Sequence, residues 1–287
     1  MAQSPAHRFG QLIGEVLEAA IRGPLEDLCR RHGLYLDSKH PRAARKSRNK
    51  VAWKDLQGNT HDLDYVIELG GTEESLGIPK AFIEIAWRRY TKHSRNKAQE
   101  IQGAIIPLAE TYRESHPFLG VVLAGVFTAG SLTQLRSHGF HLVYFPYQSV
   151  VSAFATAGID AAFDEETPDR ELAKKVARFK ALSEHKKQQL TESLRQQHAS
   201  ELAGFIAALE VSLNRRVVTV FVLPLHGQAY EMSDAHSAIV FLQAHDQADV
   251  RPEFTRYEII VRFNNGDEIR GQFQSKTTAI EFLATIK

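Results

Sequence analysis

Apolar residues near the start of the chain recur with a helical period. Over residues 9–33 they form the stripe of an amphipathic helix: Leu12, Ile13, Val16, Leu17, Ala20 and Ile21. Gly23 and Pro24 predict a break in this helix. Glu18 borders the apolar stripe and could point toward a site, although a solvated helix charge is the simpler interpretation.

Short apolar and alternating runs then predict a sheet. Residues 51–55 and 60–69 indicate a hairpin around the turn at 57–59, and alternation places Asp62 and Asp64 on the face opposite Leu63 and Tyr65. The chain continues with predicted strands at 80–87, 121–127 and 140–145 and helices at 94–114, 132–138 and 147–159. This order is typical of an α/β fold, with a mixed central sheet flanked by helices on both faces.

The rest of the chain changes character twice. Residues 164–213 are polar and helical, which predicts one or two solvent-facing helices linking two bodies, or an arm that packs on a second subunit. Residues 214–287 repeat a ββα unit, with turns at His226-Gly227 and Asn265-Gly266 and helix N-caps at Ser233 and Ser275. We therefore expect three parts: a first domain at 1–163, a helical linker or arm at 164–213, and a smaller α+β domain at 214–287 for recognition or dimerisation.

Composition narrows the classes of protein. The 287 residues carry 35 Lys and Arg against 34 Asp and Glu, so any nucleic-acid signal must be local. The single cysteine, Cys29, rules out a disulfide framework within one chain and fits a cytoplasmic location. No run approaches the ~20 apolar residues of a membrane span, and no signal-peptide core precedes the first helix, so we expect no membrane association.

Candidate chemistry centres on two neighbouring predicted strands. Asp64 and Glu84 can face each other across the sheet, and with the carbonyl of Ile85 they could hold Mg²⁺. A bound Mg²⁺ would lower the pKa of a water and neutralise charge on a phosphate. Asp64, Glu84 and Ile85 are therefore the predicted metal ligands.

In this arrangement the sequence resembles the PD-(D/E)xK nuclease superfamily, which includes many type II restriction endonucleases. Glu18, Asp64 and the run Glu84-Ile85-Ala86 follow the family pattern in order, over roughly residues 9–160. The resemblance implies a Mg²⁺-dependent endodeoxyribonuclease that cleaves double-stranded DNA, works in a restriction system and acts as a homodimer. It implies catalytic roles for Glu18, Asp64 and Glu84.

The sequence departs from this pattern at Ala86, where the family has a lysine. Three explanations compete: a cation from Lys97 or Lys92 replaces it, the site is degenerate, or the alanine is an inactivating substitution. We favour Lys97, because it begins a helix expected to pack beside strand 80–87. Glu100, one turn later, could join the metal shell, so Lys97 and Glu100 complete the predicted catalytic set.

Two basic stretches surround these residues. We predict DNA contacts from the segment after strand 80–87, at Arg88, Arg89, Tyr90, Lys92, His93, Ser94, Arg95 and Asn96. Ser94 is also a plausible N-cap for the following helix. The stretch 37–50 is equally basic, and either a mobile surface loop or a phosphate contact explains it.

Two other functions compete with the nuclease. One is a non-catalytic DNA-binding protein on a degenerate nuclease fold. The other is a structural or interaction protein that dimerises through the C-terminal repeat, and the near-neutral net charge favours it slightly.

Overall fold

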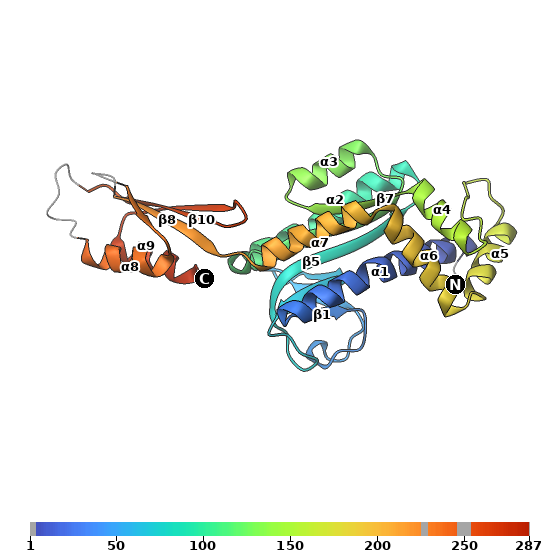
Figure 1. Cartoon of the computed structure of the whole chain (residues 1–287), viewed down its shortest axis with the longest axis horizontal. Helices are drawn as coiled ribbons and strands as arrows, with labels where there is room; N and C mark the ends of the chain where they lie inside the picture. The colour runs from blue at the N-terminus through green and yellow to red at the C-terminus, as the bar shows by residue number, and fades with distance from the viewer. Residues whose placement is uncertain (1–3, 225–228, 246–253, 287) are drawn as a thin grey trace. The chain divides into compact units, whose positions relative to one another are not determined.

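The computed structural model describes residues 4–224, 229–245 and 254–286. The chain divides into two compact units, Met1–Glu210 and Val211–Lys287 (Figure 1). Each unit has its own hydrophobic core and is described separately.

The first unit is built on a five-stranded mixed sheet with the order β1-β4-β5-β6-β7. The strands are β1 (Tyr35–Ser38), β4 (Tyr65–Leu69), β5 (Ile78–Arg88), β6 (Phe118–Gly125) and β7 (His141–Pro146). The pairs β1–β4 and β4–β5 are antiparallel, whereas β5–β6 and β6–β7 are parallel. The prediction of a mixed α/β fold is confirmed, but β1 was missed, because residues from 37 onward were expected to form an irregular loop.

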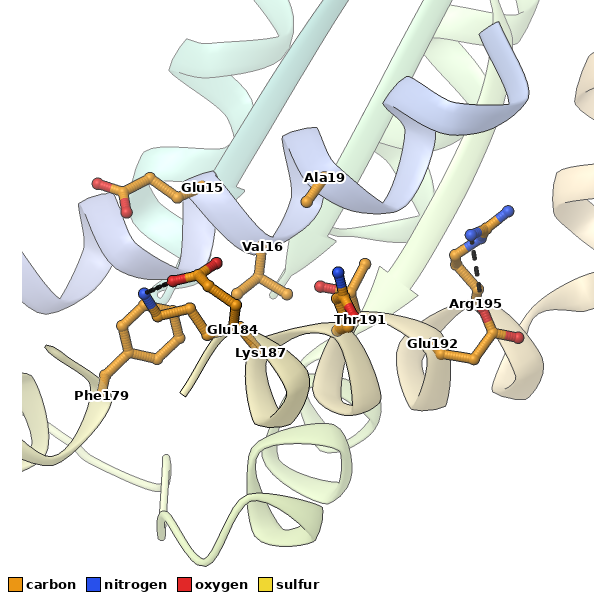
Figure 2. Close-up of a pocket in the computed structure, with 10 residues that line it drawn as sticks. Glu15, Val16, Ala19, Phe179, Glu184, Lys187, Thr191, Glu192 and Arg195 are labelled. Atoms are coloured by element: carbon orange, nitrogen blue, oxygen red, sulfur yellow. Dashed lines mark hydrogen bonds and ion pairs between the residues drawn. The ribbon is translucent and has the colours of Figure 1, made fainter. Parts of the chain in front are cut away.

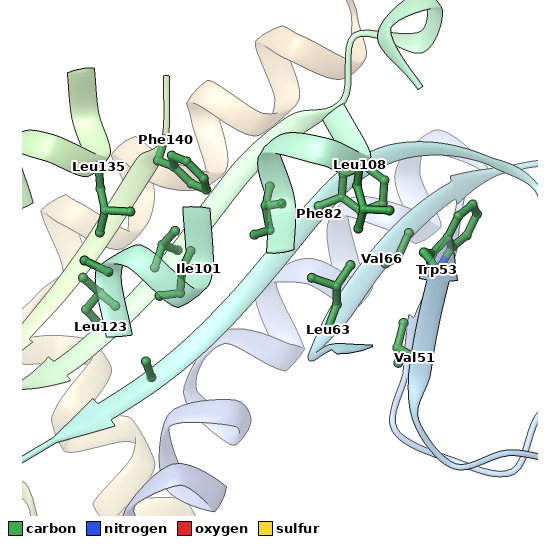
Figure 3. Packing of buried hydrophobic residues seen from close by; sticks show 14 of the residues in the cluster. Val51, Trp53, Leu63, Val66, Phe82, Ile101, Leu108, Leu123, Leu135 and Phe140 are labelled. Carbon is green, nitrogen blue, oxygen red and sulfur yellow. The ribbon is translucent and has the colours of Figure 1, made fainter. Parts of the chain in front are cut away.

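Helices cover both faces of this sheet. On one face, α2 (Thr91–Thr111) and α3 (Ala129–Ser137) share a hydrophobic core with Phe82 of β5 and Leu123 of β6 (Figure 3). On the other face lie α1 (Pro5–His32) and α4 (Tyr147–Thr156), which meet through the rings of Phe9 and Phe154. Short 3₁₀ turns at Ala43–Arg45 and Arg113–Ser115 complete the loops.

The predicted break in the first helix is wrong. Helix α1 runs without interruption from Pro5 to His32 with Pro24 in its interior. An interior proline costs roughly 3 kcal/mol. Ala20, Ile21, Leu25 and Leu28 on either side of it are completely or almost completely buried, and this burial offsets that cost.

The stretch predicted as a helical linker or arm is helical, but most of it belongs to the first compact unit. Residues 169–213 form three helices, α5 (Asp169–Lys180), α6 (Glu184–Gln197) and α7 (Ala199–Leu213). Helix α5 packs on α1, helix α6 packs on α1 and α4, and Phe205 of α7 meets Phe118 of β6 edge to face. These helices are therefore part of the first unit, whose compact body extends to Glu210.

The predicted hairpin forms a separate two-stranded sheet, β2 (Val51–Lys54) with β3 (Thr60–Leu63). The expected continuous strand over residues 60–69 is divided at Asp64, where the chain leaves β3 and enters β4. Leu63 and Tyr65 are both buried, whereas Asp62 is exposed and pairs with Lys50. Asp64 therefore lies at a junction between two sheets.

The second unit confirms the internal repeat as two ββα units. Strands β8 (Val217–Pro224), β9 (Tyr230–Met232), β10 (Tyr257–Phe263) and β11 (Glu268–Phe273) form one antiparallel sheet with the order β11-β10-β8-β9. Helices α8 (Ala235–Ala244) and α9 (Lys276–Thr285) share a core with one face of this sheet. Ser275 caps α9 as predicted, but Asp234 rather than Ser233 caps α8. The predicted turn at His226-Gly227 lies outside the described residues, and the matching turn in the second repeat has Gly266 in the left-handed region.

Within the described ranges, the structure contains no helix that is both long and apolar enough to span a bilayer.

Candidate active site

Asp64 is held where strand β4 stops covering the edge of strand β5. The pairing of the two strands reaches Tyr65 opposite Ile83, and β5 then continues to Arg88 with β6 on its other side. Asp64 Oδ2 accepts a hydrogen bond of 2.6 Å from the backbone N–H of Ile85. Because the N–H and C=O of one strand residue point to the same side, the Ile85 carbonyl also points toward this open edge.

Glu84 extends from β5 toward helix α2, where it meets Lys97. Pleating places Glu84 on the same face as Phe82 and Ala86, which pack in the core beneath α2. Lys97 Nζ donates a hydrogen bond of 3.0 Å to Glu84 Oε1, and both side chains are more than four-fifths buried. The predicted cation from α2 therefore reaches the face onto which a lysine at position 86 would project.

The structure brings the other two predicted catalytic residues to the rim of this group. Glu100 is 3.5 Å from Lys97 and 3.8 Å from Arg88, but its side chain is 60% exposed. Glu18 is half-buried on α1, and the charge of Asp64 acts on it. Asp64, Glu84 and Lys97 thus form the centre, with Glu100 and Glu18 beside it.

Burial of these carboxylates raises their pKa values. The pKa of Glu84 rises to about 7, because the group is desolvated and faces the charge of Asp64, while Lys97 opposes the rise. The pKa of Asp64 also rises through burial, and the hydrogen bond from Ile85, with Lys97 and Lys39, opposes it. The pKa of Glu18 rises through burial and through the charge of Asp64. Burial therefore raises the pKa of both carboxyls more than Lys97 lowers it.

This donor set fits Mg²⁺. Mg²⁺ binds through one or two carboxylates and keeps several waters, and Asp64, Glu84 and the Ile85 carbonyl supply three oxygen donors at one strand edge. Among the described residues, no three His, Cys, Asp or Glu side chains are grouped to hold a metal ion. Glu100 and Glu18 therefore do not complete a three-carboxylate shell.

The predicted DNA-contact segment is only partly available to a ligand. Arg89 Nε donates to the carbonyl of Phe163 at 2.6 Å and its guanidinium lies over the ring of Tyr147, so its role here is structural. Ser94 is fully buried within α2, which begins at Thr91 after Tyr90, so it is neither a DNA contact nor an N-cap.

The remaining members of the segment lie nearer the surface. Arg88 and Tyr90 are half-buried, Lys92 pairs with Glu165, and three side chains at the start of α2 are exposed: His93, Arg95 and Asn96.

A cavity of about 420 Å³ lies outside this group, between α1, α5 and α6 (Figure 2). Its lining includes Glu15, Val16 and Ala19 of α1, and Lys187 and Arg195 of α6. Neither Asp64, Glu84 nor Lys97 lines it. Glu15 lies one turn from Glu18 on α1, but the carboxylate centre itself is at the strand edge.

The sequence did not single out Lys39 as part of this site. Its charge acts on both Glu18 and Asp64. The basic character of residues 37–50 is the sequence signal that could have indicated a cation near the site. Placing Lys39 beside Asp64, however, requires the pairing of β1 with β4, in which Ser38 lies opposite Tyr65.

No protein-family model matches the chain, and no curated protein matches it. Among solved structures, the crystal structure of a protein of unknown function, AF1548, is similar in part. It has a TM-score of 0.27 and 10% sequence identity, over 65% of this chain and 97% of that chain. A similarity of this size assigns no function, so the candidate site depends on its own geometry.

Proposed function

We propose that the protein is a Mg²⁺-dependent endodeoxyribonuclease with its active site at Asp64, Glu84 and Lys97. The observation that carries the proposal is the placement of two largely buried carboxylates, Asp64 at the open edge of β5 and Glu84 on the adjacent face, with the ammonium of Lys97 paired to Glu84. Burial and the charge of Asp64 raise the pKa of Glu84 to about 7, and a strongly perturbed pKa beside a specific charge partner marks a candidate functional site. The resemblance to restriction endonucleases extends the proposal to a homodimer that acts on double-stranded DNA.

Each residue of the centre has a separate task. Asp64 is fixed by the Ile85 N–H, which occupies one carboxylate oxygen and leaves the other as a possible metal ligand. Glu84 is fixed by Lys97 and presents its other oxygen in the same way. Mg²⁺ bound there would lower the pKa of an attacking water and neutralise charge on the phosphate. The Lys97 ammonium, held in a partly dry site, stabilises the negative charge that develops on the phosphate oxygens.

Cleavage assays on supercoiled and linear duplex DNA, with Mg²⁺ or Mn²⁺, test this assignment. Asp64→Asn keeps an acceptor for the Ile85 N–H and removes the charge, and we expect it to abolish cleavage. Lys97→Met should lower the rate by roughly 10²–10³-fold, as the loss of one preorganised donor does elsewhere.

The matched control is Lys92→Met. Lys92 precedes Lys97 by five residues, is exposed and pairs with Glu165, so its loss should leave the rate within a few-fold of the parent. Loss of cleavage in Lys92→Met but not in Lys97→Met would move the cation to Lys92. Salt-dependent DNA binding without cleavage by the parent in either metal would favour the non-catalytic DNA-binding protein. Cleavage that persists in Asp64→Asn would overturn the assignment of the site.

A further inference from the structure

The stretch 39–50, called the basic loop below, contains two buried arginines and four exposed Lys and Arg side chains. Arg42 is fully buried and Arg45 almost so. The exposed cations are Lys39, Lys46, Arg48 and Lys50. Buried arginines are rare unless paired, so the pair indicates a built structure rather than an irregular surface loop.

Arg45 ties the two ends of the basic loop together. Its guanidinium donates to the carbonyls of Ser38 and His40 at the start of the loop, at 3.1 and 3.0 Å. It also donates to the carbonyls of Arg48, at 2.6 Å, and Lys50 at the end of the loop. An ion pair of 3.0 Å with Asp37 of β1 anchors it to the sheet.

Arg42 joins the basic loop to the sheet and to the loop that follows β4. It pairs with Asp37 at 2.8 Å and with Glu68 at 2.6 Å, and it donates to the carbonyls of Thr72 and Ser75. Glu68 in turn accepts from the Gly77 N–H at 2.6 Å. Two arginines and two carboxylates thus fix the basic loop without its exposed side chains.

The tip of the basic loop is strained. Lys46 and Ser47 have φ values of 54° and 57°, in the left-handed region that costs such residues roughly 1–2 kcal/mol each. The Ser47 N–H donates to the Arg42 carbonyl at 2.8 Å, which holds the turn closed. Strain maintained by a buried network points to a functional segment.

The basic loop borders the carboxylate centre on the side of Asp64. Lys50 pairs with Asp62, two residues before Asp64. Lys39 acts electrostatically on Glu18 and Asp64. Across residues 4–224, 229–245 and 254–286, no ion pair forms at Lys39, Lys46 or Arg48.

We propose that the basic loop is a prefolded arm that binds the phosphate backbone of DNA beside the carboxylates. The proposal rests on the proposed nuclease function and names the surface that holds its substrate. A site made of carboxylates repels a polyanion, and exposed cations next to it offset that repulsion. A loop already fixed by Arg42 and Arg45 loses little conformational entropy when it binds.

The test measures DNA binding without cleavage. Fluorescence anisotropy of a labelled short duplex, in EDTA, gives the dissociation constant of the full chain at several salt concentrations. Lys39→Gln/Lys46→Gln/Arg48→Gln should make the salt slope shallower by about 2.7, at about 0.9 per phosphate contact. Between 50 and 200 mM salt the parent should therefore lose roughly 40-fold more affinity than this variant.

The control removes three cations from elsewhere in the same unit, Lys174→Gln/Arg178→Gln/Lys180→Gln on α5. These side chains are exposed, and the charge removed is the same. We expect the control to retain most of the parent's salt slope. Equal slopes for the two triple variants, or a parent that does not bind the duplex, would overturn the assignment of the basic loop. Cleavage that is lost in Asp64→Asn, together with a parental slope in the basic-loop variant, would leave the nuclease standing and reject the arm alone.

Discussion

Replacing Glu84 by glutamine should make the protein more stable, and by an amount that depends on pH. A carboxyl whose pKa rises from an ordinary 4.5 to about 7 on folding binds its proton more tightly in the folded state. Its contribution to the free energy of unfolding therefore falls as pH increases from about 4.5 to 7, and the Glu84→Gln variant would not show this loss. At roughly 1.4 kcal/mol per pH unit, the stability advantage of Glu84→Gln should grow by about 2.5 kcal/mol between pH 5 and pH 8.

Urea unfolding in EDTA, followed by tryptophan fluorescence, measures this difference. Both tryptophans, Trp53 and Trp87, lie in the first unit, so the signal reports on the unit that holds Glu84. The matched control is Glu110→Gln, an exposed carboxylate on the same helix as Lys97, which should change the free energy of unfolding by less than about 0.5 kcal/mol.

Two outcomes would refute the reasoning. If Glu84→Gln is less stable than the parent at pH 8, the pair with Lys97 outweighs the cost of burying the charge. If the difference does not change with pH, Glu84 titrates near its ordinary value. The expected growth between pH 5 and pH 8 corresponds to a further rise of roughly 5–10 °C in the melting-temperature difference between Glu84→Gln and the parent.

Three further outcomes follow from the structure. The affinity for Mg²⁺, measured by calorimetry, should be roughly tenfold weaker at pH 6 than at pH 8, because Glu84 has a pKa of about 7 and must lose its proton first. Glu84→Gln should remove this pH dependence. Arg42→Met should lower the free energy of unfolding, measured by urea titration, by roughly 3–5 kcal/mol, because it leaves Asp37 and Glu68 buried with an unbalanced charge. The control Arg30→Met removes an exposed arginine and should cost under about 1 kcal/mol. Gly125→Ala should destabilise the folded protein by at least about 2 kcal/mol, because φ is 98° at this residue and an added Cβ would lie 2.1 Å from the Arg88 carbonyl oxygen. The control Gly103→Ala on α2 places its Cβ in open space and should stabilise the folded protein by up to about 1 kcal/mol.

The strands with strong apolar runs could be predicted from the sequence. Strands β5 and β6 and the repeat in the second unit follow from alternation and turn residues alone. Strand β1 could not be predicted in this way. Its Asp37 is fully buried, and only the later residues Arg42 and Arg45 make that burial tolerable. The same ion pairs of Arg42 and Arg45 fix residues 39–50, which the sequence alone indicates as an irregular charged loop.

The candidate site was predicted in its residues but not in its surroundings. Lys97 pairs with Glu84, and Asp64 reaches the same strand at Ile85, because the order of the strands and the first turns of α2 suffice to place them. Arg89 shows the limit of such reasoning. Its contacts with Phe163 and Tyr147 join residues that are more than fifty positions apart, and no local sequence pattern predicts them.

In the proposed nuclease, Lys97 takes the part that a lysine at position 86 has in the family that the sequence resembles, and this has an evolutionary consequence. By single substitutions, a lysine can move between positions 86 and 97 only through an intermediate sequence that has lysine at both positions or at neither. The form with none leaves Asp64 and Glu84 buried without a counter-charge, which is strongly unfavourable. In the form with two, each carboxylate has a cation of its own, so a lineage could pass through it and later lose either lysine.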